Sequence, residues 1–305
     1  SDTANVYTTF RTGPDPTGSG RQMSTTIGSS SEVNAKSRFY SEREFSTYQM
    51  GERAANILGY DTKLTDRWGA HFSFERAHIY DLSEMNANRN AGAVEISYVD
   101  RDFLKIVSRY ELRYDGENED RLHWLFRDTV DWKINEDYSF SARFNRSDTN
   151  RFGDNIFATD ASFTELNMGV AYRPVRHNRL NVLTRYTWLD EVGAKSQFDT
   201  PDIFGIKVDE SAHIFGLEFG YELLPSLLGL VEKWAYRRTS LEAEGDTTYI
   251  GHFLWVNRFN FHVVRKWDLA LEYRLLWDTG LLEALKHGAL VELDREIMNY
   301  IRFGI

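Results

Sequence analysis

The 305-residue chain has no cysteine and carries 46 acidic against 36 basic residues, which gives a formal net charge of −10. Without cysteine it cannot form a disulfide, a thiolate metal site or a cysteine nucleophile, and the acidic balance excludes the clustered basic surface of a nucleic-acid-binding protein. No run of 18 apolar residues occurs, so a transmembrane helix is excluded as well.

The N-terminal part of the chain is the least patterned. Residues 1–21 are rich in glycine, serine, threonine and proline, and this composition predicts a linker, a lumen plug or a surface tether. Between residues 22 and 50 the alternation is weak, because Arg38, Arg43 and Glu44 interrupt both faces. Two further strands are expected before residue 51.

Apolar and polar residues then alternate in one segment after another. In residues 101–114, Leu104 and Tyr110 belong to an apolar face, whereas Arg109 and Glu111 belong to a polar one. A period of two is the signature of a strand whose faces meet different environments. The same alternation occurs in residues 121–134, 138–144, 180–188, 215–223, 249–261 and 266–278.

The segment 266–278 has the clearest pattern, and the length of its apolar face can be compared with the thickness of a membrane. Its apolar face begins at Trp267 and ends at Trp277, ten residues later. At about 3.3 Å per residue and a tilt of roughly 40°, the two indoles lie about 25 Å apart along a membrane normal. That distance matches the spacing of the two aromatic girdles of a membrane-spanning β-barrel.

The links between the predicted strands alternate in length from residue 50 onward. Short turns are expected near 65–66, 99–102 and 135–136, and longer links near residues 147–161 and 240–246. Outer-membrane barrels have short periplasmic turns and longer extracellular loops. The sequence therefore predicts an all-β, antiparallel, up-and-down transmembrane β-barrel of about 14–18 strands over residues 22–305.

Three C-terminal stretches carry a family resemblance. Residues 267–277 (WDLALEYRLLW), 288–293 (GALVEL) and 300–304 (YIRFG) resemble the C-terminal barrel of large repeat-containing outer-membrane proteins of Gram-negative bacteria. Such barrels are similar to porins and to the translocator domains of surface proteins. The resemblance implies a location in the outer membrane, upstream repeats, and at least one further strand after Ile305.

Charged residues on the polar faces are the first set of candidate functional residues. They form either a charged pore lining that selects ions or solutes, or a set of cross-strand ion pairs that holds the lumen together. The mixture of signs favours pairing. The residues are Arg109, Glu111, Arg113, Arg127, Arg143, Arg185, Glu218, Arg258, Glu272 and Arg274.

Large aromatic residues on the apolar faces are the second set. Anchoring at the lipid interface is the favoured interpretation; the alternatives are the core of a soluble sandwich and stacking on sugars. The residues are Trp68, Trp124, Trp132, Trp188, Trp234, Trp255, Trp267, Tyr273 and Trp277.

Catalysis and cofactor binding find no support in the sequence. The histidines form no HExxH or similar spacing, and no GxSxG occurs. Asp148, Asp154 and Asp160 fall with Arg151 in the expected loop 147–161, where a solvated loop is favoured over a calcium site or catalytic carboxylates. We expect neither an enzyme nor a metal or other cofactor.

Four functions fit the predicted fold, and a barrel enzyme is the least supported of them. We favour a porin-like conduit for small solutes or a housing for a partner polypeptide. The alternatives are a membrane anchor or translocator module of a larger surface-exposed protein, and a scaffold in a multi-protein outer-membrane complex. The expected partners are outer-membrane lipid, other envelope proteins and the chain's own N-terminal or extracellular domains.

Overall fold

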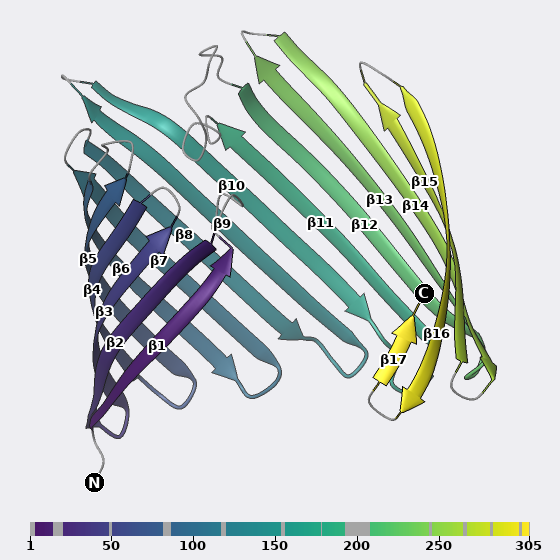
Figure 1. Ribbon diagram of the computed structural model, residues 1–305, viewed down its shortest axis with the longest axis horizontal. Helices are drawn as coiled ribbons and strands as arrows, with labels where there is room; N and C mark the ends of the chain where they lie inside the picture. Colours follow the sequence, from purple (N-terminus) through teal and green to yellow (C-terminus); the bar gives the residue numbers. More distant parts are fainter. Residues whose placement is uncertain are drawn as a thin grey trace. The chain divides into compact units, whose positions relative to one another are not determined.

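The computed structural model describes most of the chain as strands and turns. The described residues are 4–14, 21–48, 51–81, 87–116, 120–153, 156–177, 179–192, 208–243, 246–264, 267–280, 283–298 and 301–304. They form 17 strands, and consecutive strands run in alternating directions (Figure 1). None of these residues belongs to a helix long and apolar enough to cross a membrane.

The strands are long, and most exceed ten residues. They are β1 (Ala4–Pro14), β2 (Arg21–Asn34), β3 (Ser37–Tyr48), β4 (Gly51–Lys63), β5 (Trp68–Asp81), β6 (Ala87–Asp100), β7 (Leu104–Gly116), β8 (Asp120–Lys133), β9 (Tyr138–Gly153), β10 (Ile156–Tyr172), β11 (Leu180–Val192), β12 (Val208–Leu224), β13 (Leu228–Ala243), β14 (Asp246–Val264), β15 (Trp267–Thr279), β16 (Ala284–Met298) and β17 (Ile301–Gly304).

The chain divides into two compact units, which are described separately. The first unit comprises residues 1–129, 144–164 and 192–205; the second comprises residues 130–143, 165–191 and 206–305. In the first unit β1 to β7 pair antiparallel in chain order. In the second unit β11 to β17 do the same. The prediction of an all-β, antiparallel, up-and-down fold is confirmed.

The N-terminal segment differs from the prediction. Ala4–Pro14, placed by its composition in a linker, plug or tether, forms β1 and pairs with β2. Val6 and Phe10 alternate with Tyr7, whose hydroxyl donates a hydrogen bond to the Glu42 carboxylate. Aromatic and β-branched residues suit a pleated surface, and here they outweigh a composition dominated by the glycine, serine and proline of residues 13–20.

One predicted long link is also different. β9 continues to Gly153 and β10 begins at Ile156, so most of the expected loop 147–161 is strand. Asp148 is therefore a strand residue; it is buried and lies 3.2 Å from the Arg146 guanidinium. Asp154 lies outside the described residues.

The short turns are closed by local hydrogen bonds. Between β4 and β5, the Thr65 hydroxyl accepts hydrogen bonds from the backbone N–H groups of Arg67 and Trp68 at 3.2 and 3.1 Å. This side-chain geometry mimics a backbone turn. The pKa of the Arg67 guanidinium is raised, mainly by its hydrogen bond to the Tyr98 hydroxyl and next by the charge of the Asp100 carboxylate. These contacts fasten the turn to the neighbouring hairpin.

Neither face of the sheet is covered by a packed apolar core. Among the described residues, the buried hydrophobic positions are alanines and one valine, Val256. Large apolar side chains are instead exposed on one face, including Phe74 at 50% and Leu112 at 54%. A soluble β-sandwich would bury such residues between its sheets. The fold therefore presents its apolar face outward.

Candidate functional site

The strand registers place the predicted charged residues on one face. Directly opposed residues of an antiparallel pair point to the same side of the sheet. Glu95 faces Arg109, Ala93 faces Glu111, and Ala91 faces Arg113. We call this side of β1 to β8 the polar face of the first unit, and the opposite, apolar side its outward face.

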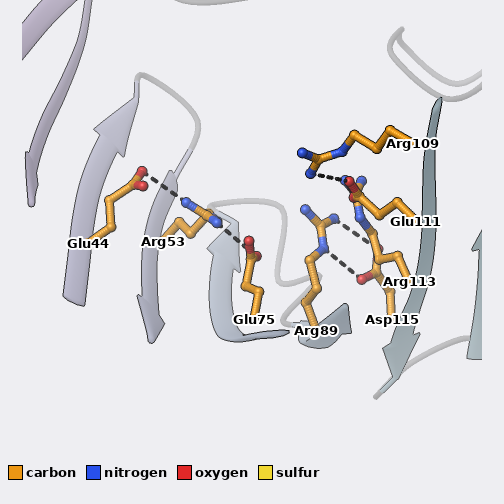
Figure 2. Close-up of polar contacts among 8 residues, drawn as sticks. All are labelled: Glu44, Arg53, Glu75, Arg89, Arg109, Glu111, Arg113 and Asp115. Carbon is orange, nitrogen blue, oxygen red and sulfur yellow. Dashed lines mark hydrogen bonds and ion pairs between the residues drawn. The ribbon is translucent and has the colours of Figure 1, made fainter. Parts of the chain in front are cut away.

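A row of ion pairs runs across the polar face of the first unit (Figure 2). Arg53 bridges two carboxylates, with Glu44 at 2.9 Å and Glu75 at 2.7 Å. Because its guanidinium is planar and always charged, it can bind both neighbours at once. Three adjacent strands, β3, β4 and β5, are thereby joined by side chains as well as by backbone hydrogen bonds.

The row continues on β6 and β7. Arg89 binds Asp115 through two parallel hydrogen bonds of 2.7 and 2.9 Å. Arg109 and Arg113 both donate to Glu111, at 3.1 and 2.9 Å (Figure 2). Paired charges of this kind satisfy the polar groups of a face that has no apolar core to cover it.

Small residues lie between the arginines. Ala55 and Ala77 face each other and are 1% and 0% exposed, and Ala91 and Ala93 are nearly as buried. A methyl group next to a long guanidinium side chain lets that side chain lie along the sheet, where its stem covers the methyl. The alternation of small and long residues thus keeps the charged groups close to the wall.

The polar face of the second unit contains a comparable group. Arg258 lies 3.4 Å from Glu272 and 2.8 Å from Glu292, and Arg274 also binds Glu272. These residues come from the three neighbouring strands β14, β15 and β16. The face is therefore cross-linked by shared carboxylates in the same way as the face in the first unit.

The ten predicted charged residues all lie on polar faces, but they do not all pair. Glu218 binds Lys233 at 3.0 Å, and Arg127 donates to the Asn145 side-chain oxygen at 3.0 Å. Arg143 and Arg185 are exposed and form no ion pair within the described part of the chain. Structural pairing therefore accounts for most of the set, while a role in lining a pore stays a prediction.

A row of aromatic residues crosses the outward face of the second unit. Register places its members directly opposite one another on five successive strands. The row consists of Tyr186, Phe215, Tyr236, Phe253 and Trp277. Only Trp277 belongs to the predicted set, because the others become neighbours through registers that no single strand reveals. Such a row matches one of the aromatic girdles of a membrane barrel.

The predicted aromatic residues lie on the outward faces. Trp68 packs against Tyr98 with ring centroids 4.9 Å apart, and Trp234 lies directly opposite Trp255. Trp267 and Trp277 mark the two ends of β15. The others are Trp124, Trp132, Trp188 and Tyr273. Their anchoring at the lipid interface stays a prediction. Such anchoring requires that they lie on the outward faces, as they do.

Metal binding has no counterpart in the described residues. Within the ranges given above, no three histidine, aspartate or glutamate side chains gather closely enough to hold a metal ion. Some histidines instead pair singly with a carboxylate, as His252 does with Asp278 at 2.7 Å, whereas His213 and His287 bind tyrosine hydroxyls. These pairs belong to the network of polar contacts on the strands.

Comparison with known proteins gives distant structural likenesses only. OmpT, an outer membrane protein of Vibrio cholerae, is 14% identical, with 95% of this chain and 94% of that chain covered and a TM-score of 0.40. A bacterial polysaccharide outer membrane secretin is 13% identical, with 96% and 97% covered and a TM-score of 0.42. The siderophore receptor PiuA from Acinetobacter baumannii is 8% identical, with 99% and 66% covered and a TM-score of 0.45. No protein-family model and no curated protein matches.

The assignment of the fold rests on the strands themselves. An exposed apolar face rich in aromatic residues, a polar opposite face and long paired strands are the features by which β-structure spans a bilayer. Strands that cross a membrane belong to closed barrels, since an open edge would leave backbone groups unsatisfied in lipid. The chain therefore has the fold of an outer-membrane β-barrel.

Proposed function

We propose that this barrel is a porin-like conduit for small hydrophilic solutes. The observation that carries the proposal is the polar face of the first unit, where ion-paired arginines and carboxylates lie along the wall above buried alanines. Such a face is stable in contact with water and does not need a packed core. We propose no catalytic role and take outer-membrane lipid as the direct partner.

The charge balance of that face supports passage of small polar solutes of either sign. In the row of Figure 2, four arginines stand beside four carboxylates, and Glu95 on the same face lies 3.8 Å from Arg109. Charge rings of one sign select against ions of that sign, whereas balanced rings select weakly. A conduit built in this way sorts solutes by size more than by charge.

Conductance in a planar bilayer tests the proposal. The full chain, folded in detergent and inserted into the bilayer, is expected to give a steady current that is linear in voltage. A double substitution, Arg109→Gln with Arg113→Gln, removes both cations that contact Glu111. The reversal potential in a salt gradient should then shift toward cation preference.

A matched substitution on the outward face provides the control. Arg238 stacks over Tyr249 at 4.9 Å on that face, so Arg238→Gln should leave the reversal potential unchanged. A folded chain that carries no current would overturn the conduit and favour a housing for a partner polypeptide. If the reversal potential shifts equally in the control and in the double variant, the polar face does not determine the ion preference.

A further inference from the structure

One cross-strand row on the outward face of the first unit is polar and borders an apolar row on the side of the short turns. Its members are directly opposed on four successive strands, β3 to β6. They are Arg43, Asn56, Arg76 and Asn90, and all four are exposed. The next row toward the short turns contains Leu58 and Phe74, both exposed and apolar. Polar side chains on an otherwise apolar face need a polar group from outside the chain to bind them.

The two arginines of this row have no carboxylate partner. Within the described ranges neither Arg43 nor Arg76 forms an ion pair, in contrast to Arg53 and Arg89 on the polar face. The Arg43 guanidinium lies 5.0 Å from the centre of the Phe45 ring. One strand separates the two residues, so their backbones are about 10 Å apart. Two long side chains over that distance can converge on one anion.

A hollow of about 220 Å³ adjoins the row. Its lining includes Phe10, Met23, Phe45 and Tyr80, from β1, β2, β3 and β5, and also the acidic Glu52 of β4. Phe45 belongs to both features, because it lines the hollow and lies under the Arg43 guanidinium. Since the hollow contains an acidic residue and lies on the side of the row away from the short turns, an anion is expected at the arginines and not in the hollow.

The height of the row on the sheet matches the headgroup level of the outer leaflet. Arg76 is eight residues from Trp68 along β5, and Trp68 lies at the short-turn end. At about 3.3 Å per residue and a tilt of roughly 40°, Arg76 lies about 20 Å above Trp68 along the membrane normal. A hydrophobic band about 25 Å tall then ends just above the row, and the long side chains can reach the interface.

We propose that Arg43, Asn56 and Arg76 bind the phosphorylated headgroup of an outer-leaflet lipid. The guanidinium groups bind the phosphate, since their planar donors match its oxygens. The acyl chains lie over the apolar row of Leu58 and Phe74. A lipid is favoured over a protein partner because the cations sit at headgroup height with continuous apolar surface below them.

A matched pair of lipids tests the proposal on the unchanged chain. The chain is folded in an uncharged detergent, and the binding of phosphatidic acid is compared with that of diacylglycerol of the same acyl chains by native mass spectrometry. We expect phosphatidic acid to bind at least tenfold more tightly. Equal binding would overturn the proposal, as would displacement of phosphatidic acid by an equal concentration of inorganic phosphate, which would indicate a site for free phosphate.

Substitutions then locate the site. Arg43→Gln with Arg76→Gln should weaken phosphatidic acid binding by about thirtyfold, because each basic residue at a headgroup contributes about fivefold. Arg185→Gln, which removes an exposed arginine from the polar face of the second unit, should change it less than twofold. Equal losses in the two variants would overturn the assignment. Conductance should be the same in the double variant as in the unchanged chain, so this site and the conduit can fail independently.

Discussion

Replacing Glu232 by leucine tests whether the outward face of the second unit contacts lipid along its whole height. Glu232 lies on the outward face of β13, directly opposite Phe219 on one side and Asn257 on the other. The Asn257 side-chain nitrogen donates a hydrogen bond to its carboxylate at 3.0 Å. A carboxylate in the middle of an apolar face is unexpected, because a charge is costly in contact with lipid.

The depth of Glu232 follows from the registers. Asn257 lies opposite Tyr273, which is six residues from Trp267 and four from Trp277 on β15. Glu232 is therefore about 15 Å from one aromatic level and about 10 Å from the other along the membrane normal. Such a position is close to the middle of the hydrophobic band.

The expected gain can be bounded from this depth. A cationic residue on the lipid face costs about 2–4 kcal/mol at the midplane, and an acidic residue costs less. The hydrogen bond from Asn257 offsets about 1 kcal/mol of that cost. We therefore expect Glu232→Leu to raise the free energy of unfolding by about 1 kcal/mol.

Reversible urea unfolding of the full chain in lipid vesicles measures this change. Glu232→Gln keeps the shape and the hydrogen bond but removes the charge, so it should raise stability by a smaller amount in the same direction. If both variants instead lose 1 kcal/mol or more, the carboxylate is satisfied by a group other than Asn257. Contact of this part of the face with lipid chains would then be refuted.

Two further substitutions test the polar face of the first unit in the same urea assay. Gly59→Ala would place a Cβ atom 2.0 Å from Cζ of the Tyr40 ring, so stability should fall by about 1–3 kcal/mol; the loss should shrink when Tyr40→Ala is added, and an undiminished loss would contradict the contact. Arg53→Gln leaves Glu44 and Glu75 without their shared cation, so stability should fall by about 1–3 kcal/mol; an unchanged midpoint would show that the bridge contributes nothing.

Much of the fold can be predicted from the sequence because strand alternation is a local property. In β15 the contrast between Leu269, Leu271 and Trp277 on one face and Asp268 and Glu272 on the other is visible without any partner strand. The number of strands and the up-and-down order follow from repeating that pattern. The charged face of β7 is predicted for the same reason.

The parts that were missed depend on information that one strand does not hold. In β2, serine and threonine occupy both faces, with Thr25 and Ser29 outward and Thr26 and Ser30 on the polar side, so the hydrophobic contrast disappears. β9 continues as strand beyond Ser147, where apolar residues are no longer required. The register between strands is equally hidden, and it is the register that places Arg43 beside Asn56.

Arginines on the two faces differ in the side chains that they contact. On the polar face of the first unit Arg53 and Arg89 bind carboxylates, whereas the cation–π contacts in the described residues involve outward arginines, of which Arg146 also binds Asp148. Arg43 stacks on Phe45 and Arg295 on Trp267 in this way. An arginine over an aromatic ring keeps its charge accessible while its stem and the ring remain apolar. This arrangement suits a membrane interface, where one side of a residue meets lipid chains and the other meets charged headgroups.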